Sequence, residues 1–313
     1  MIAPSRPGET MAITTTQLGK RYGTTGNSKA KWALRECTLD VPEGRICGLV
    51  GANGAGKTTL LKLLVGLARP SSGSVRVLGQ PSDTPAFLRD VGYLAQEVPL
   101  YRRWTAADHL SLGANLNGVW DGEAARERLQ SLDIPLDQRV GTMSGGQRAQ
   151  VALALALGKR PRLLLLDEPV AALDPLARRE FLASLGAAVA ESEGGLTVIL
   201  SSHLVSDLER ICDYLVVLAE SRNLLSGDLD GVLASHRLLT SARRDIGSIE
   251  HQHTVLRVEH TPRQTSVWVR LEGTLHDPSW QSEEMSLEDI VLAYLARRPV
   301  QAADAPAAIG GVR

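Results

Sequence analysis

The residues with the clearest chemical potential form one continuous stretch, Gly51–Thr58, which runs Gly-Ala-Asn-Gly-Ala-Gly-Lys-Thr. It fits the pattern G-x-x-x-x-G-K-[ST], in which a glycine-rich loop wraps around a phosphate group. Because glycine adopts backbone conformations closed to other residues, successive N–H groups of the loop can point inward at an anion. Lys57 would reach the β- and γ-phosphates of a nucleotide, and the Thr58 hydroxyl would ligate Mg²⁺. A plain glycine-rich turn is the alternative interpretation.

The elements around this stretch favour the phosphate loop. Before it, Arg45–Val50 is a short apolar segment typical of a buried strand, and after it the leucines within Leu60–Leu67 recur at helical spacing. Strand, loop and helix in that order are the context that the pattern needs. A helix that begins near Lys57 also points the positive end of its dipole at the bound anion.

Two acidic residues, Asp167 and Glu168, end a second apolar segment, Arg162–Leu166, which is typical of a central strand in a parallel sheet. Adjacent carboxylates at the end of a buried strand are costly unless a cation or a reactive group lies nearby. Asp167 is placed to hold Mg²⁺ and Glu168 to polarise an attacking water. The alternative interpretation is that these are two surface acids in a loop, and the presence of a phosphate loop in the same chain disfavours it.

Two further polar residues also follow predicted strands. Gln96 comes directly after Val91–Ala95, and His203 follows Leu196–Leu200 by way of two serines. Because ligands of an α/β sheet bind at the carboxyl ends of its strands, both residues are candidates for the site, and His203 for contact with a γ-phosphate. Taken singly, such a glutamine is more often a solvated loop residue and such a histidine a structural one.

A second glycine-rich segment, Met143–Arg148, opens the apolar helix predicted over Ala149–Leu157. Ser144 fits the N-cap of that helix, and Asp174 before Pro175 fits the N-cap of another. A helix start with two glycines also presents free N–H groups, which makes Met143–Arg148 a candidate second anion site. The residues alone leave both interpretations of this segment open.

The other segments predict two additions to an α/β core. Ala12–Leu18 and Ala33–Val41 alternate like strands of a half-buried antiparallel sheet. Strand signals then stop over residues 97–161, where Thr105–Leu116 and Gly122–Leu132 have helical spacing. We therefore expect a helical insertion there.

Together, the segments from about Met11 to Asp228 resemble the ATP-binding subunit of an ATP-binding cassette (ABC) transporter. The motifs occur in the order of that family: Walker A at Gly51–Thr58, the Q-loop at Gln96, the signature at Ser144–Gln147, Walker B at Leu163–Asp167, the D-loop at Ala172–Pro175 and the switch histidine at His203. Met143 for the usual leucine and Ala172 for a common glycine are small departures. The resemblance implies an α/β fold, a P-loop NTPase parallel-sheet core with an antiparallel β subdomain and an inserted helical subdomain at about residues 97–161.

The same resemblance implies ATP and Mg²⁺ as cofactors and gives each site residue a role. Catalysis falls to Lys57, Gln96, Glu168 and His203, and metal binding to Thr58, Gln96 and Asp167. Nucleotide contacts fall to Tyr22, Asn53, Gly54, Ala55, Gly56, Lys57, Thr58, Thr59, Ser144, Gly145, Gly146, Gln147 and Asp174. Tyr22 would stack on adenine, although plain packing is the alternative. Two such domains would pair head to tail, so that Ser144 and Gly146 of one close over ATP held by Lys57 of the other, with Asp174 communicating across the pair.

Composition limits the remaining functions. The chain has 313 residues, more than one core usually needs, and its formal net charge of −1 gives no electrostatic case for nucleic acid or an anionic membrane surface. Apolar runs are too short to span a bilayer, and residues 1–10 lack the apolar region of a secretory signal. Cys37, Cys47 and Cys212 are scattered in apolar segments, as expected of buried thiols in a reducing compartment. We expect a soluble, cytoplasmic chain that reaches the inner face of the membrane only through a permease.

The region 229–298 predicts a small α+β appendage. Its expected elements are a helix over Asp228–Leu239, a hairpin of Thr254–His260 with Thr265–Glu272, and an amphipathic helix that begins at the capping box Ser286–Asp289. That last helix resembles the C-terminal segment of ATPase subunits in bacterial drug-export systems. A metal site of His251, His253 and His260 is the alternative to exposed strand histidines, which we favour. Residues 1–10 and 299–313 are predicted to be disordered.

The sequence thus predicts an ATP-hydrolysing subunit that powers a separately encoded permease, with export favoured through the resemblance of the tail. The permease would contact Gln96–Trp104, where Tyr101 and Trp104 either anchor a partner helix or belong to the local core. One rival is a soluble ATPase of the same superfamily that acts on ribosomes or nucleic acid, disfavoured by the single cassette and the lack of heptads and basic stripes. A regulatory protein that only binds nucleotide is disfavoured by Glu168 and His203.

Overall fold

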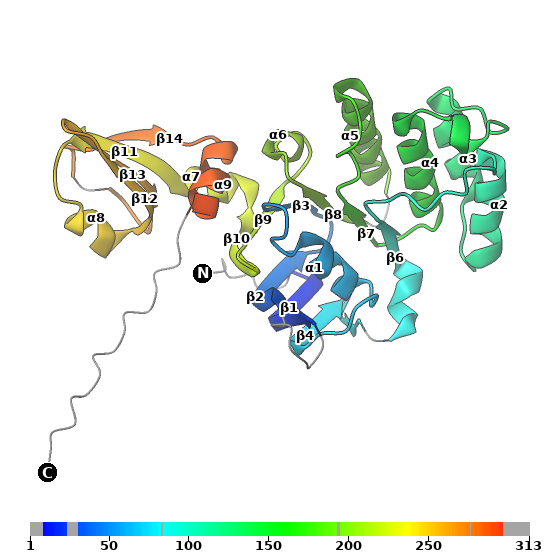
Figure 1. Cartoon of the computed structure of the whole chain (residues 1–313), viewed down its shortest axis with the longest axis horizontal. Helices are drawn as coiled ribbons and strands as arrows, with labels where there is room; N and C mark the ends of the chain where they lie inside the picture. Colours follow the sequence, from blue (N-terminus) through cyan, green and yellow to red (C-terminus); the bar gives the residue numbers. More distant parts are fainter. Residues whose placement is uncertain (1–8, 24–30, 83, 193–194, 276, 297–313) are drawn as a thin grey trace, which may run out of the picture. The chain divides into compact units, whose positions relative to one another are not determined.

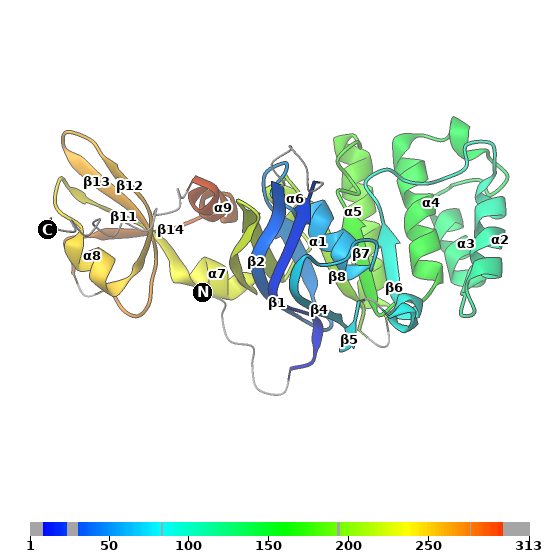
Figure 2. The same ribbon diagram turned by 60° about the horizontal axis from the view of Figure 1, so that its bottom comes forward.

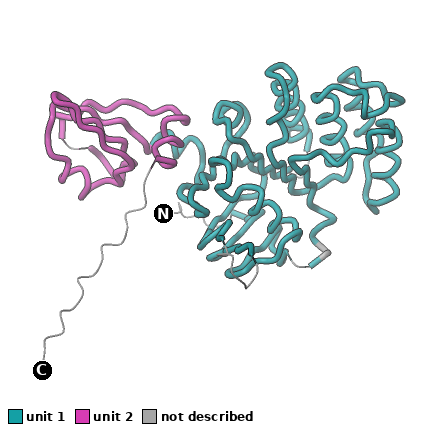
Figure 3. Tube along the Cα trace, viewed as in Figure 1, with its two compact units in different colours: residues 1–234 teal, residues 235–313 magenta. Residues whose placement is uncertain are grey.

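The computed structural model describes residues 9–23, 31–82, 84–192, 195–275 and 277–296. The chain forms two compact units, residues 1–234 and 235–313, which Figure 3 shows in different colours. The ends predicted to be disordered, residues 1–10 and 299–313, lie outside the described residues apart from Glu9 and Thr10. For these two the prediction is wrong, because Thr10 O accepts a hydrogen bond from Glu43 N–H (2.8 Å) and Glu9 pairs with Arg45.

A six-stranded sheet forms the centre of the first unit. Its spatial order is β10 (Arg222–Asp228), β9 (Tyr214–Ala219), β3 (Ile46–Val50), β8 (Thr197–Ser202), β7 (Leu163–Asp167) and β6 (Val91–Leu94). All pairings are parallel except that of β10 with β9 at one edge. Strands β7, β8 and β9 are buried along their whole length, and the apolar runs Leu163–Leu166, Val198–Leu200 and Leu215–Ala219 do not alternate with polar residues, as is typical of central parallel strands.

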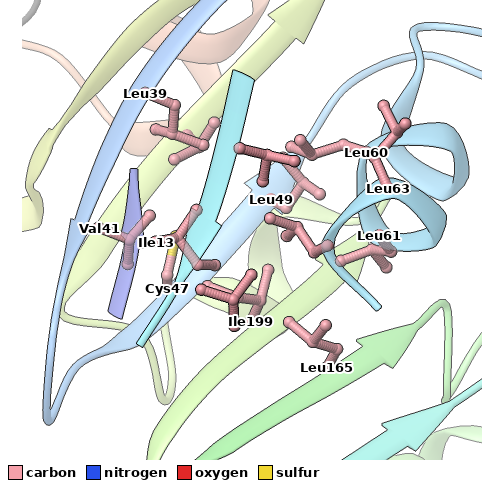
Figure 4. Packing of buried hydrophobic residues seen from close by; sticks show 14 of the residues in the cluster. Ile13, Leu39, Val41, Cys47, Leu49, Leu60, Leu61, Leu63, Leu165 and Ile199 are labelled. Carbon is pink, nitrogen blue, oxygen red and sulfur yellow. The ribbon is translucent and has the colours of Figure 1, made fainter. Parts of the chain in front are cut away.

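Helix α1 (Lys57–Leu64) separates this sheet from a smaller antiparallel one (Figure 1). The antiparallel sheet has the order β2 (Lys31–Pro42), β1 (Met11–Tyr22), β4 (Ser72–Val77) and β5 (Gln80–Pro81). The core between the sheets combines the α1 leucines with side chains of both sheets, among them Ile13, Leu39, Val41, Leu49, Leu60, Leu61, Leu63, Leu165 and Ile199 (Figure 4). This packing holds the start of α1, and with it the phosphate loop, at the carboxyl edge of the central sheet.

Helices α5 (Pro175–Ala190) and α6 (Val205–Leu208) cover the other face of the central sheet, opposite α1 in Figure 1. Phe181 of α5 and Leu208 of α6 are completely buried. Leu208 packs directly against β3 at Gly48, where an added Cβ would lie 3.1 Å from the Leu208 Cδ1. The short helix α6 is therefore fixed to the sheet through one leucine.

The predicted helical insertion is present and lies beside β6 (Figure 2). It comprises α2 (Ala106–Leu116), α3 (Gly122–Ser131) and α4 (Gly145–Gly158), with a short 3₁₀ helix at Val140–Thr142 before α4. Another 3₁₀ helix, Pro85–Asp90, precedes β6. The insertion has its own hydrophobic core, which includes Leu110, Leu129, Val140, Met143 and Val151. The side chains of Thr105 and Asp121 cap the starts of α2 and α3.

The second unit is a four-stranded antiparallel sheet with two helices. Its order is β12 (Thr254–His260), β13 (Gln264–Arg270), β11 (His236–Ala242) and β14 (Gln281–Glu284), with α8 (Gly247–Gln252) and α9 (Leu287–Ala296). The predicted hairpin and final helix are confirmed, and Ser286 Oγ accepts the Asp289 N–H (3.1 Å) at the start of α9.

Two predictions for this region are wrong. The helix expected over Asp228–Leu239 is only α7 (Leu229–Ser235), because the chain then turns into β11, where Leu239 enters the sheet core. The three histidines are not all exposed strand residues: His251 lies in α8, and His253 at its end is buried, with its Nδ1 accepting the Glu272 N–H (3.3 Å). Only His260 fits the expectation. Within the described residues no three metal-ligating side chains are grouped together.

The three cysteines are buried and unpaired, as predicted. Among the described residues no helix has both the length and the apolar character to cross a bilayer.

Candidate functional site

The phosphate loop has the backbone that its glycines predict. Gly54 and Gly56 have φ values of +82° and +111°, a region that glycine enters without strain. Gly56 is the N-cap of α1 and offers no side chain to cap it, so the N–H groups of the first turn are left for an anion. The loop is therefore shaped to receive phosphate at the positive end of α1.

Lys57 is buried at the start of α1, with 7% of its side chain exposed. Its Nζ donates to Gly51 O (2.7 Å) and lies 3.1 Å from Glu168 Oε1, whose side chain is equally buried at 8%. A buried ammonium of this kind needs a negative partner, since an unpaired charge in the interior is strongly destabilising. In this structure the carboxylate of Glu168 is that partner.

Glu168 also meets His203. Its Oε2 accepts a hydrogen bond from His203 Nδ1 (2.8 Å), and because a carboxylate only accepts, the proton lies on Nδ1. Glu168 has φ +49°, which a residue with a side chain adopts only at some cost in strain. Its backbone N–H donates to Ser201 Oγ (2.8 Å), and this bond holds the strained turn after β7.

Asp167 is completely buried and faces α1. Its Oδ1 accepts from Thr58 Oγ1 (3.1 Å) and from Ser201 Oγ (3.0 Å), whereas Oδ2 has no hydrogen-bond partner within the described residues. A buried carboxylate oxygen without a donor, next to a threonine hydroxyl, suits a hard divalent cation such as Mg²⁺. The donor set at Asp167 and Thr58 thus fits the metal that the sequence predicts.

Ser201 is a site residue that the sequence reasoning missed. It bonds both members of the acidic pair, as donor to Asp167 and acceptor from Glu168. The signal that could have found it is register: Asp167 of β7 and Ser201 of β8 are direct neighbours in the parallel sheet.

A cavity of about 560 Å³ brings Lys57, Thr58, Glu168 and His203 together, whereas Asp167 and Ser201 do not line it. It is lined by Tyr22, Lys31, Trp32, Ala33, Ala52, Asn53, Gly54, Gly56, Lys57, Thr58, Thr59, Gln96, Glu168, Ala171 and His203. The structure therefore brings together most of the predicted site, and Tyr22, 46% exposed, sits within reach of a base. Lys31 and Trp32 were not predicted, because nothing in their spacing relates them to the phosphate loop.

The signature segment and Asp174 do not line this cavity. Ser144 is exposed and completes a capping box with Gln147 at the start of α4, and the carboxylate of Asp174 caps α5. The two segments touch each other: an added Cβ on Gly146 would lie 2.8 Å from the Ala177 Cβ, and one on Gly145 would lie 3.5 Å from the Leu173 Cδ2. Both interpretations of Ser144, cap and anion site, remain compatible with this geometry.

Comparison with known proteins places the chain in a family. A family model described as "ABC transporter" matches residues 34–171, and one described as an AAA domain, putative AbiEii toxin, matches residues 137–206. An ABC transporter ATP-binding protein of Nostoc is 39% identical over 65% of this chain and 62% of its own length. The Nod factor export ATP-binding protein I of Burkholderia orbicola is 34% identical over 71% of this chain and 70% of its own. The bacitracin transport ATP-binding protein of Bacillus licheniformis is 31% identical, with 68% covered on both sides.

Solved structures agree. The ATP-binding subunit of an ABC transporter superposes with a TM-score of 0.60 at 28% identity, covering 71% of this chain and 92% of its own. An ATP-binding cassette solved as a dimer in a post-hydrolysis state with ADP and Pi gives 0.60 at 25% identity, covering 69% and 98%. The chain spans 62 to 66% of the length of its relatives from Nostoc, Synechocystis and Bacillus subtilis. The chain belongs to the ATP-binding subunits of ABC transporters, a family of ATPases.

Proposed function

We propose that this chain binds ATP with Mg²⁺, hydrolyses it, and powers export through a separately encoded membrane permease. The observation that carries the catalytic part is the meeting of Lys57, Glu168 and His203 in one cavity at the end of the phosphate loop. A cation to hold the phosphates, a carboxylate to orient water and an imidazole at the γ-phosphate are the groups that phosphoryl transfer needs.

The ground-state geometry defines the first step. Lys57 and His203 both bond to Glu168, so ATP binding has to transfer Lys57 Nζ from the carboxylate to the phosphates. Glu168 is then free to accept a hydrogen bond from water and to orient it toward the γ-phosphorus, while His203 turns to a γ-phosphate oxygen. Asp167 and Thr58 would hold Mg²⁺, which neutralises charge on the phosphate oxygens, and Gln96 at the cavity rim would sense it.

A second ATP-binding subunit would complete the site. Ser144 of the signature is exposed, Gly145–Gln147 are half-buried, and none of these residues lines the cavity of its own chain, which supports their use on the ATP of a partner. A similar cassette was solved as a dimer with ADP and Pi, which supports pairing of two ATP-binding subunits. Ser144 and Gly146 of one copy would close over ATP held by Lys57 of the other, and Asp174 would lie next to that contact.

The permease contact is proposed at Gln96–Trp104. The rings of Tyr101 and Trp104 lie 4.8 Å apart and are 58% and 39% exposed as residues, so they are not local core. The His109 ring contacts both of these rings, and its Nε2 accepts the Tyr101 N–H (2.9 Å). Exposed aromatic pairs on a fixed loop are suitable anchors for a partner helix.

Export is proposed from the relatives. The Nod factor export proteins of Burkholderia orbicola and Mesorhizobium japonicum and the bacitracin transport protein are covered by this chain over 70%, 66% and 68% of their lengths. A methionine import protein is 36% identical but is covered over only 54%. This chain therefore spans a larger part of the Nod factor export and bacitracin transport proteins than of the importer.

The catalytic proposal is tested with Glu168→Gln. We expect turnover to fall by about 10²- to 10⁴-fold, the range for loss of a general base, while ATP still binds. Glu180→Gln, an exposed glutamate on α5, is the matched control and should keep full activity. If Glu168→Gln hydrolysed ATP at the wild-type steady-state rate, the assignment of Glu168 as the base would be wrong.

The transport proposal uses the same variant, because blocked turnover should hold the ATP-bound complex together. Tagged Glu168→Gln is isolated with ATP from detergent-solubilised membranes, and its partners are identified by mass spectrometry. A stoichiometric polytopic membrane protein, lost when Tyr101 and Trp104 are both changed to alanine, is the expected result. Ribosomal proteins or nucleic-acid complexes in its place would establish the rival ATPase.

A further inference from the structure

Arg178, whose side chain is 24% exposed, and the buried Asp207 form a charged pair outside the cavity. Arg178 lies in the first turns of α5, four residues after Asp174, and Asp207 lies in α6, four residues after His203. Asp207 is 5% exposed. The Arg178 Nε and the Asp207 Oδ2 are 3.9 Å apart. The pair therefore joins the helix that follows the Asp174 segment to the helix that follows the switch histidine.

Both facing atoms lack a hydrogen bond. Within the described residues, neither Arg178 Nε nor Asp207 Oδ2 has a partner at bonding distance. Burying such groups unsatisfied is costly, and a charge-assisted hydrogen bond between them would need a distance about 1 Å shorter. Burial raises the pKa of the Asp207 carboxyl, and the positive charges of Arg178 and Arg210 counteract it. The pair is thus held in an open arrangement that a small movement of α6 or of the start of α5 would close.

The pair lies within a chain of contacts that begins at the signature. Gly146 packs on Ala177, the neighbour of Arg178, and Gly145 packs on Leu173. Arg178 Nη2 donates to the Leu173 carbonyl at 3.4 Å.

The chain of contacts continues to the catalytic carboxylate. The Asp207 N–H donates to Leu204 O (3.3 Å), so Asp207 is bonded to the residue directly after His203. His203 in turn bonds Glu168. A displacement at the signature can reach the imidazole through these contacts alone.

We propose that Arg178 and Asp207 are positioning residues that tie His203 to the Leu173–Asp174 segment, so that closure of a second copy on that segment brings the histidine to its working position. The proposal rests on the proposed dimeric ATPase. The two-state element is the ion pair, open at 3.9 Å here and hydrogen-bonded after closure. His203 moves with α6, because Leu208 holds the far end of that helix on β3 as a pivot.

The test is steady-state ATPase kinetics of Asp207→Asn, which keeps the shape of the side chain and removes its charge. We expect kcat to fall about tenfold, within the range for residues that carry coupling, while the KM for ATP changes less than about twofold. Asp207→Glu keeps the charge and should retain kcat. Asp213→Asn, which alters a carboxylate paired with Arg45, is the control and should keep kcat as well.

A second variant separates positioning from stability. In Arg178→Gln/Asp207→Asn both charges of the pair are removed together, so the Tm should return toward the wild-type value while kcat stays low. If kcat recovers together with the Tm, or if Asp207→Asn hydrolyses ATP at the wild-type rate, the proposal is overturned. The double variant carries the test if Asp207→Asn does not fold. Failure of the ATPase proposal would be visible separately, since the wild-type protein would then not hydrolyse ATP.

Discussion

The phosphate loop side of the site and the signature side are built in opposite ways. Lys57, Asp167 and Glu168 are buried and bonded to one another or to neighbouring strands. Ser144 and Asp174 are exposed, and their side chains accept N–H groups from the first turn of their own helices. Buried charges have to be paired inside the chain, because an isolated one would destabilise the fold. Exposed caps can be complete by themselves and still face a partner.

The difference fits the proposed two-copy ATP site, in which each chain has to be stable while it holds only one side of the site. On the phosphate loop side, the Glu168 carboxylate pairs with Lys57, the cation that would bind the phosphates of ATP. The Lys57 ammonium is therefore not left unpaired when no nucleotide is bound. On the signature side, the N-cap hydroxyl and the two glycines leave the first-turn N–H groups of α4 near the surface. Disturbing the first side should therefore affect the chain itself, and disturbing the second should affect only the assembled dimer.

Lys57→Ala should have the largest effect on nucleotide binding. Loss of a buried cation that contacts phosphate is expected to weaken ATP affinity by at least about thirtyfold, and it leaves the Glu168 carboxylate facing only His203. Binding is measured with a fluorescent ATP analogue, and the Tm is recorded in parallel. Lys62→Ala, on the solvent side of α1, is the matched control. Unchanged affinity in Lys57→Ala would contradict the phosphate loop.

Mixing two inactive variants tests whether the halves meet across copies. Lys57→Ala loses the phosphate side, and Ser144→Asp keeps an N-cap acceptor on α4 but places a carboxylate where the signature would approach ATP. If two copies of this chain pair, an equimolar mixture should recover about a quarter of wild-type ATPase activity, since half of the dimers are mixed and each has one intact site. Each variant alone should remain inactive. No recovery would show that the two halves of a site do not come from two copies of this chain.

The sequence predicted the parts of this comparison that depend on local pattern. The loop Gly51–Thr58, the buried strand before Asp167 and the caps at Ser144 and Asp174 are each specified within about ten residues of chain. Fixed spacing along one strand or helix is what such patterns record. These segments could therefore be identified from sequence, and the meeting of the phosphate loop with Glu168 in one cavity follows from the parallel sheet.

Other residues could not be found in this way, because strand register or tertiary packing brings them together. Ser201 meets Asp167 only through the pairing of β7 with β8, and Asp207 meets Arg178 across two helices. In the second unit, the helix predicted over Asp228–Leu239 ends early for the same reason, because His236–Ala242 becomes a strand by pairing with β13 and β14. Neither partner is near it in sequence.

The smallest effect, and the sharpest division between cap and site, is expected from Ser144→Ala compared with Asp121→Ala. Both side chains accept a first-turn N–H, so each variant should lose about 1 kcal/mol of unfolding free energy at neutral pH. Only Ser144→Ala should also lower ATPase activity, by several-fold, if its hydroxyl faces the ATP of a partner. Equal ATPase activity in the two variants would mean that Ser144 only caps α4 and does not act on the ATP of a partner.

The pH dependence of stability should separate the same two caps. The hydrogen bond from Ala124 N–H, and then Arg160, lower the pKa of Asp121, so its contribution is present above the pKa of the unfolded chain and is lost as the pH falls through the folded value. The stability gap between wild type and Asp121→Ala should therefore close in acid. The gap for Ser144→Ala should stay constant, because a hydroxyl does not titrate there. Chemical denaturation at neutral and acid pH measures both gaps, and a Ser144→Ala gap that also closed in acid would mean that the α4 cap depends on a carboxylate elsewhere.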